Sequence, residues 1–246
     1  VSKRMKQFLT CYYEKAKVYR LGGDEFTIVL PNCNITESER FAQKLVALFK
    51  EKFTIASHEN FITPSVGISV YPHDGEDAGT LIKHADTAMY HVKANGKGNY
   101  QLFNESMQQQ FYRKMMIENQ LRLAIDLEEF ELYYQPIIDL QSNVIIGMEA
   151  LIRWQNERLG FLGPDEFIPI AEETDLIVPM GKWVLEKAIK QQRLWQAQGY
   201  ALKISINISV RQLLSTTFND DIQMAIEQNG IDPSFVNIEI TESIAM

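Results

Sequence analysis

The chain has 246 residues, 46% of them hydrophobic, and a formal net charge of −8 at pH 7. This length allows one large domain or two small ones with packed cores, and no apolar run is long enough to cross a bilayer. Residues 1–103 carry 13 Lys and Arg against 11 Asp and Glu, whereas residues 104–246 carry 11 against 21, so the acidic second half is a poor grip for the phosphates of a nucleic-acid polymer.

The beginning of the chain and its two cysteines indicate a reducing compartment. Residues 1–10 are basic and amphipathic, unlike a secretory leader. Cys11 and Cys33 have no metal-ligand spacing and are interpreted as free thiols. We therefore expect a cytoplasmic location without membrane contact in this chain, although regions outside it could anchor the protein to a membrane.

Residues 1–103 predict a mixed α and β domain. Its elements are expected to be a helix over 3–13, strands over 18–21 and 26–30, a helix over 36–53, a strand over 66–70 and a helix over 78–94. Gly22-Gly23 separates the first two strands, which is typical of a tight hairpin because both residues can adopt positive φ. Asp24 and Glu25 follow directly. Glycines let a phosphate approach the backbone closely, and carboxylates beside them can hold the metal ion that accompanies the phosphate. The alternative is an ordinary hairpin turn without a ligand.

Three segments of this half resemble a GGDEF domain: 20–26 (Arg-Leu-Gly-Gly-Asp-Glu-Phe), 65–69 (Ser-Val-Gly-Ile-Ser) and 85–90 (Ala-Asp-Thr-Ala-Met-Tyr). That family makes cyclic di-GMP from two GTP molecules. The resemblance implies that Asp24 holds a metal and helps activate the ribose hydroxyl, with Glu25 in support. It further implies that Gly22 and Gly23 border the nucleotide, and that Lys93 and Lys97 contact its phosphates.

The resemblance begins after the family's first strand, helix and guanine-binding loop. That first strand carries another metal-binding Asp, so we expect no cyclase activity from this chain alone. The family's product-inhibition motif, Arg-x-x-Asp, is replaced by Tyr-Glu-Lys-Ala at 13–16.

Residues 104–117 are interpreted as a helical linker, either one stiff helix or a short loop that leads into a helix. Beyond it, elements are expected at 131–138 (strand), 144–154 (strand), 164–173 (loop and short helix), 180–198 (helix), 202–209 (strand), 212–229 (helix) and 236–241 (strand). Strands that alternate with helices favour a parallel sheet or a barrel.

Three of these strands place polar residues on one side only. Asn207 alternates with isoleucines, Glu239 lies in a similar strand, and Glu149 shares a side with Leu151 and Arg153. If this side lines a barrel, Glu149, Asn207 and Glu239 converge near the carboxyl ends of the strands, where barrel active sites lie. The alternative is an open sheet with a solvated polar side.

The second half resembles an EAL domain in five ordered segments: 134–137 (Tyr-Gln-Pro-Ile), 149–154 (Glu-Ala-Leu-Ile-Arg-Trp), 167–172 (Phe-Ile-Pro-Ile-Ala-Glu), 206–209 (Ile-Asn-Ile-Ser) and 239–243 (Glu-Ile-Thr-Glu-Ser). These enzymes hydrolyse cyclic di-GMP with two Mg²⁺ or Mn²⁺ ions on a TIM-like barrel. The resemblance implies three metal ligands, Glu149, Asn207 and Glu239. It implies that Gln135, Leu151 and Arg153 bind substrate, and that Glu242 acts as a catalytic residue that steadies a loop near the metals.

Together the resemblances predict a hybrid cyclic di-GMP turnover protein: the last part of a GGDEF domain (1–103), the linker (104–117) and the first half of an EAL domain (118–246). The fold class is α/β, with a partial cyclase-like domain whose antiparallel hairpin lies in a mixed sheet, then a partial TIM-like barrel. The family's Asp pair, its Lys and its final Glu would lie after Met246, so we expect the isolated chain to be inactive. Cyclic di-GMP, GTP and a second copy in a homodimer are the expected partners. A non-catalytic receptor for the dinucleotide is the competing hypothesis.

Overall fold

The computed structural model describes residues 2–13, 15–55 and 58–240. Glu14, in the segment that replaces the product-inhibition motif, and Glu242 lie outside the described residues. The chain divides into two compact units, Val1–Tyr112 and Arg113–Met246. Among the described residues, no helix has both the length and the apolar composition needed to span a bilayer.

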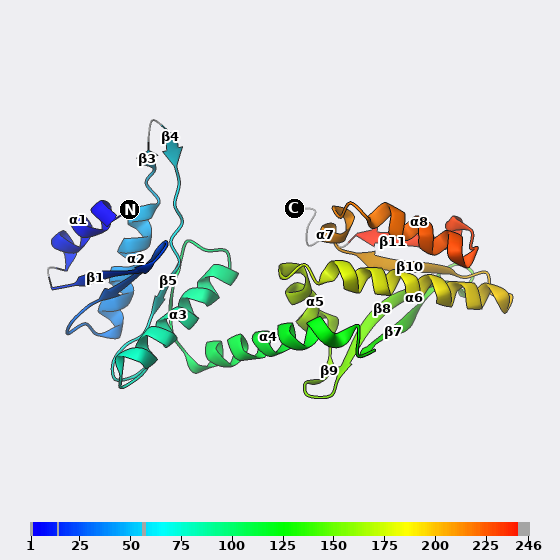
Figure 1. The fold of residues 1–246 in the computed structure, drawn as a ribbon, viewed down its shortest axis with the longest axis horizontal. Helices are drawn as coiled ribbons and strands as arrows, with labels where there is room; N and C mark the ends of the chain where they lie inside the picture. The colour runs from blue at the N-terminus through cyan, green and yellow to red at the C-terminus, as the bar shows by residue number, and fades with distance from the viewer. Residues whose placement is uncertain (1, 14, 56–57, 241–246) are drawn as a thin grey trace. The chain divides into compact units, whose positions relative to one another are not determined.

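The first unit contains small sheets packed on helices (Figure 1). Its elements are α1 (Ser2–Tyr12), β1 (Lys17–Gly22), β2 (Glu25–Val29), α2 (Ile35–Phe49), β3 (Phe53–Ile55), β4 (His58–Asn60), β5 (Val66–Ile68), α3 (Ala78–Ala94), β6 (Tyr100–Leu102) and the start of α4 (Glu105–Ala124). Strands β1 and β2 pair antiparallel, as do β3 and β4, and β5 pairs parallel with β6. Within the described part of the chain the β1–β2 hairpin is a two-stranded sheet by itself. The sequence had predicted that this hairpin lies in a larger mixed sheet, and that prediction is wrong.

The core of this unit forms between α1 and α2. Met5, Phe8 and Leu9 on α1 pack against Phe41 and Leu45 on α2. Helix α2 begins with a reciprocal cap, in which Asn34 and Glu37 each accept the other's backbone N–H. It ends at Phe49, four residues earlier than expected, because the chain turns into β3, which pairs with β4.

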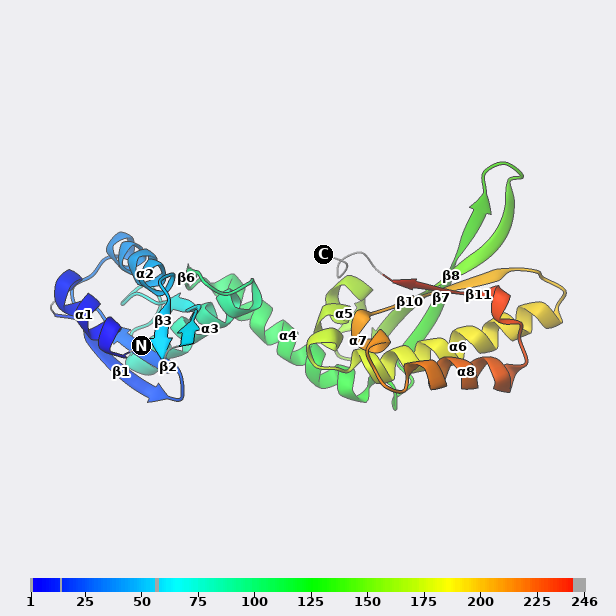
Figure 2. The same ribbon diagram turned by 90° about the horizontal axis from the view of Figure 1, so that it is seen from above.

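The second unit is an open mixed sheet with helices on one face (Figures 1 and 2). Its further elements are β7 (Phe130–Asp139), β8 (Val144–Asn156), β9 (Gly160–Leu162), α5 (Pro164–Glu173), α6 (Ile177–Ala197), β10 (Lys203–Ile208), α7 (Val210–Leu213), α8 (Phe218–Asn229), η1 (Pro233–Phe235) and β11 (Val236–Ile240). The strand order is β11-β10-β8-β7, with β9 paired to β8. Strand β10 is parallel to β8 and β11, whereas β7 and β9 are antiparallel to β8. The expectation of a purely parallel sheet is therefore wrong for β7, because β7 and β8 form a hairpin.

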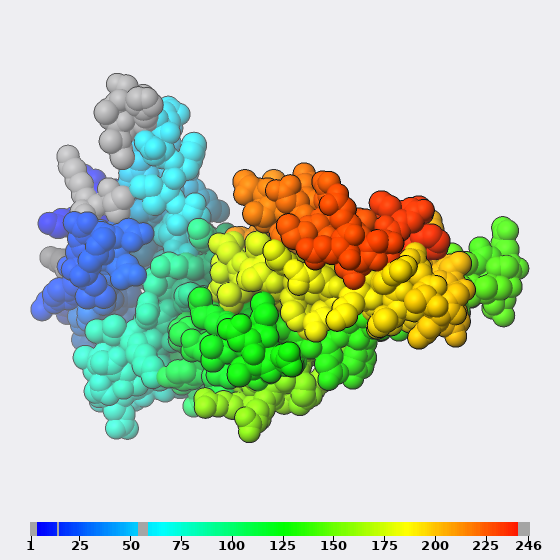
Figure 3. Space-filling model, turned by 45° about the vertical axis from the view of Figure 1, so that its right-hand side comes forward, coloured from blue at the N-terminus to red at the C-terminus, as the bar shows by residue number. Residues whose placement is uncertain are grey.

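Two helices cover one face of this sheet. Ile204, Ile206 and Ile208 of β10 are almost completely buried in a core with Leu185 and Ile189 of α6. In the space-filling view the side chains of α8 (orange to red) lie directly against those of α6 (yellow) (Figure 3). This packing fixes which side of each strand faces the helices, and so which side stays open.

The far end of the β7–β8 hairpin projects beyond the other strands (Figure 2). Its register shifts between Ile137 and Ile138, which marks a bulge. Leu140 at the turn is 95% exposed. The projecting end therefore adds little to the core, which lies under the other half of the hairpin.

Candidate functional site

The open face of the sheet brings together polar residues from four neighbouring strands. In the strand register Gln135 lies opposite Glu149, Glu149 opposite Ser205, and Asn207 opposite Glu239. Paired residues point to the same side of a sheet. Gln135, Glu149, Asn207 and Glu239 therefore occupy one face, as the alternating pattern predicted for Glu149, Asn207 and Glu239.

Burial of the opposite face explains this orientation. Ala150 and Ile206 are buried under the helices, so their neighbours Glu149 and Asn207 must point the other way. A slip of one residue would expose the isoleucines and bury the carboxylate. The apolar pattern of the strands thus sets the direction of the polar side chains.

Glu149 and Asn207 are in direct contact. The Asn207 Nδ2 amide donates a hydrogen bond of 2.7 Å to Glu149 Oε1, although the two residues are 58 positions apart. Both side chains are half-buried, and Glu239 is exposed on the next strand. Since β10 lies between β8 and β11, the two carboxylates flank Asn207 from either side.

This donor set suits a hard divalent cation. Carboxylate and amide oxygens are the ligands that Mg²⁺ and Mn²⁺ prefer, and here three adjacent strands present them. Across the described ranges, no group of three or more His, Cys, Asp or Glu side chains gathers closely enough to hold a metal. Glu149 and Asn207, which are in contact, are candidates for two ligands, and Glu239 is the candidate for a third.

Arg153 and Leu151 continue along the same side of β8. Arg153 lies opposite Glu131, and Leu151 lies opposite Tyr133. The Arg153 guanidinium lies 5.5 Å from the centre of the Tyr133 ring and donates a 2.8 Å hydrogen bond to the Ile152 carbonyl. Glu131 and Tyr133 were not predicted from the sequence, although alternation along the strand places them on the same side of β7 as Gln135.

A buried polar cluster holds the end of β8 beyond Arg153. Trp154 is completely buried, and its indole Nε1 donates a 2.9 Å hydrogen bond to Glu129 Oε2. Asn156 Nδ2 donates to the same carboxylate oxygen at 2.9 Å, and Asn156 Oδ1 accepts the backbone N–H groups of Arg158 and Leu159. The cluster ties the β8–β9 turn to the start of β7.

In the first unit the candidate residues lie at the β1–β2 turn. Gly22 pairs with Glu25, so the two central turn residues are Gly23 and Asp24, not Gly22 and Gly23 as expected. Gly23 has φ +49°, whereas Gly22 is the last residue of β1. The Arg20 side chain stabilises the turn, because its Nε and Nη2 donate hydrogen bonds to the Gly23 carbonyl at 3.0 and 2.6 Å.

The cationic candidates of this unit stand at the end of α3. Lys93 and Lys97 are exposed, and Lys97 has φ +61° in the turn that follows the helix. Among the hydrogen bonds and ion pairs of the described residues, none joins either lysine to Asp24 or Glu25. No hydrogen bond or ion pair between described residues therefore joins these two halves of the candidate site.

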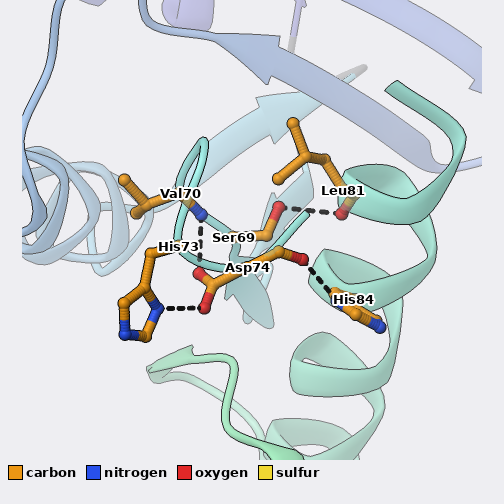
Figure 4. A network of polar contacts seen from close by, with 6 residues as sticks. All are labelled: Ser69, Val70, His73, Asp74, Leu81 and His84. Atoms are coloured by element: carbon orange, nitrogen blue, oxygen red, sulfur yellow. Dashed lines mark hydrogen bonds and ion pairs between the residues drawn. The ribbon is translucent and has the colours of Figure 1, made fainter. Parts of the chain in front are cut away.

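A polar network fixes the loop between β5 and α3 (Figure 4). The buried Asp74 carboxylate accepts the Val70 N–H at 2.7 Å and contacts His73 Nδ1 at 2.7 Å. The Asp74 carbonyl accepts a 2.6 Å hydrogen bond from His84 Nδ1, so His84 carries its proton on that nitrogen. This network holds the loop on α3, the helix that carries Lys93.

An ion pair links the two helices behind the second unit's sheet. Lys182 Nζ of α6 lies 2.7 Å from Asp221 Oδ1 of α8, and this hydrogen bond is the main cause that lowers the pKa of Asp221. Because the pKa of Asp221 is lower in the folded state, its ionisation stabilises the fold at pH values above the unfolded-state pKa of about 3.9. This stabilisation is lost as the pH falls through the folded-state pKa. We expect Asp221→Asn to cost up to about 1 kcal/mol at pH 7 and almost nothing once the pH is below the folded-state pKa of Asp221, measured by urea unfolding at pH 7 and at that lower pH. An equal cost at both pH values would contradict an electrostatic origin.

Comparison with known families identifies both units. Residues 118–246 match the family described as EAL domain, and residues 1–99 match the family described as diguanylate cyclase, GGDEF domain. MucR of Pseudomonas aeruginosa, a bifunctional diguanylate cyclase/cyclic di-GMP phosphodiesterase, is 36% identical over 93% of this chain, which covers 34% of MucR. The cyclic di-GMP phosphodiesterase PdeR of Escherichia coli is 33% identical over 96% of this chain, which covers 35% of PdeR. The chain thus spans about a third of the length of these relatives.

Solved structures with similar folds include complexes with the dinucleotide. The PaMucR phosphodiesterase in complex with c-di-GMP superposes with a TM-score of 0.51 at 37% identity, over 53% of each chain. The EAL enzyme Bd1971 in its cAMP- and cyclic-di-GMP-bound form gives a TM-score of 0.52 at 27% identity, over 71% of this chain and 46% of that one.

Proposed function

The chain belongs to the EAL domain family and carries a GGDEF domain ahead of its EAL domain, and from this premise we propose that it serves metal-dependent hydrolysis of cyclic di-GMP to the linear dinucleotide. Both are domains of cyclic di-GMP metabolism. The observation that carries the proposal is the 2.7 Å contact between Asn207 and Glu149 on the open face of the sheet. It supports a ligand pair between the parallel strands β8 and β10, close to the carboxyl end of β10, and barrel enzymes hold their substrates at the carboxyl ends of parallel strands.

In this proposal Glu149, Asn207 and Glu239 hold Mg²⁺ or Mn²⁺ through oxygen atoms. A bound divalent cation would supply Lewis acidity and lower the pKa of a bound water to near neutrality. The Asn207 side chain then offers Oδ1 to the cation, which requires its amide to turn from the orientation in which Nδ2 donates to Glu149. The helices under the sheet keep the backbones of these ligands in place.

Four further residues complete the proposed site. Gln135 and Leu151 contact the dinucleotide on either side of Glu149, and the Arg153 guanidinium pairs with a phosphate, for which its planar donors are suited. Glu242 steadies a loop near the metals as a catalytic residue. The open sheet belongs to the first half of a TIM-like barrel, which residues 118–246 supply after a linker at 104–117.

The GGDEF domain, residues 1–103, acts as a diguanylate cyclase or as a GTP-binding regulator of the EAL domain. Asp24 holds a metal with support from Glu25, Gly22 and Gly23 border the nucleotide, and Lys93 and Lys97 contact the phosphates. Because two GTP molecules are joined, the cyclase would act as a homodimer. Both activities would take place in the cytoplasm.

A second candidate function is that of a non-catalytic cyclic di-GMP receptor. Degenerate family motifs would favour it, whereas the intact Glu149 and Asn207 weigh against it. The isolated chain would then bind the dinucleotide without cleaving it.

One experiment separates these functions. Cyclic di-GMP is incubated with the full-length protein and with this chain, in Mn²⁺ or in EDTA, with and without GTP, and the products are resolved by chromatography. We expect the full-length protein to form the linear dinucleotide only when Mn²⁺ is present. Binding without hydrolysis by the full-length protein would support the receptor and contradict the enzyme.

A further inference from the structure

A glycine in the second turn of α6 is packed against a glutamine from another helix. Gly181 is buried, and a Cβ built on it would lie 1.6 Å from Gln212 Nε2 and 2.3 Å from Gln212 Cδ. Glycine weakens a helix relative to alanine, so its presence here indicates a close approach. Any larger residue at position 181 would displace the Gln212 side chain.

Gln212 in turn holds the chain at the point where β10 ends. Ser209 N donates to Gln212 Oε1 at 3.1 Å, and Gln212 N donates to Ser209 Oγ at 3.2 Å. Both residues are buried, with exposures of 5% for Gln212 and 8% for Ser209. A displaced Gln212 side chain would leave the buried Ser209 N–H without its acceptor, which is costly.

This reciprocal cap lies two residues from Asn207. Ser209 directly follows Ile208, the last residue of β10, and Asn207 projects from the opposite face to meet Glu149. The direction of the Asn207 side chain depends on the backbone at the end of the strand. The core fixes that backbone through Ile206 and Ile208, and the cap fixes it through Ser209.

We propose that Gly181 and Gln212 are positioning residues that set the orientation of Asn207. Gly181 makes room for the Gln212 amide, the amide holds Ser209 N–H, and Ser209 sets where the strand ends. The part of this inference that concerns a metal rests on the proposed function. The part that concerns the contact between Asn207 and Glu149 does not.

The test compares Gly181→Ala, Gln212→Ala, the double variant and the exposed α6 control Lys190→Ala. Side-chain amide signals of Asn207 are recorded by ¹⁵N NMR without metal, and Mn²⁺ affinity is measured by titration calorimetry. We expect each single variant to shift the Asn207 signals and to weaken Mn²⁺ binding by about 10-fold, as supporting residues of metal ligands do. The double variant should match Gln212→Ala, since no amide remains for the added methyl group to displace.

The outcomes separate this inference from the proposed function. Unchanged Asn207 signals in Gln212→Ala, or additive effects in the double variant, would overturn the positioning role even if the wild type binds Mn²⁺. If the variants shift the Asn207 signals but the wild type binds no Mn²⁺, the positioning role is supported and the metal-dependent enzyme is not. If Gly181→Ala does not fold by circular dichroism, Gln212→Ala alone decides, because it removes the same hydrogen bond without adding bulk.

Discussion

Glu149→Gln in the full-length protein should lower the rate of cyclic di-GMP hydrolysis by more than about 100-fold at fixed Mn²⁺. Mutation of residues that merely support metal ligands already lowers metal affinity or activity by about 10- to 100-fold. The neutral amide keeps the size of the side chain and loses the negative charge that a cation requires. Asn207→Ala should act in the same direction, because Asn207 contacts Glu149 directly. The measurement is the initial rate of linear dinucleotide formation over a range of Mn²⁺ concentrations.

The matched control is Glu157→Gln, which makes the same chemical change at an exposed position after β8. It should hydrolyse at the wild-type rate. Full activity of Glu149→Gln with Mn²⁺, or an equal loss in both variants, would rule out Glu149 as a metal ligand.

Trp154→Ala should lower the free energy of unfolding of the second unit by about 4 kcal/mol, the usual cost of removing a large buried aromatic side chain. Trp154 is completely buried, and its ring lies 5.5 Å from that of Phe167 and 5.8 Å from that of Phe130. The substitution opens a cavity between these rings. It also removes the indole N–H that donates a hydrogen bond to the Glu129 carboxylate. Urea unfolding followed by far-UV circular dichroism measures the loss.

The control is Phe161→Ala on the neighbouring strand β9, where the aromatic ring is 58% exposed. This substitution should lower the free energy of unfolding by no more than about 0.5 kcal/mol, as is typical of surface substitutions. Similar losses for Trp154→Ala and Phe161→Ala would show that the buried cluster does not stabilise the unit.

The sequence predicted the faces of the second sheet well because burial has a simple signature. Alternating isoleucines in β10 must meet the helices, so Asn207 had to project from the other side. The same logic placed Glu149 and Glu239 on that side. It also places Tyr133 and Glu131 of β7 on that side, although the motif at 134–137 does not include them.

Other features could not be predicted from local pattern. The stretch 212–229 was expected to be one helix, but the structure has α7 and then α8, with a break between Leu213 and Phe218. The reciprocal cap of Ser209 and Gln212 starts α7 earlier than expected, and the Gln212 side chain occupies the space that Gly181 of α6 leaves open. In the first unit, pairing of Gly22 with Glu25 moved the turn by one residue.

By itself the sequence determined which side chains of each strand face the helices and which face away, because an alternating pattern must bury its apolar half. Only the tertiary structure decided which strands are neighbours. It placed β8 beside β10, so that Glu149 meets Asn207, and it turned β7 antiparallel. Strand order and direction depend on contacts between residues far apart in the chain, and no local pattern encodes such contacts.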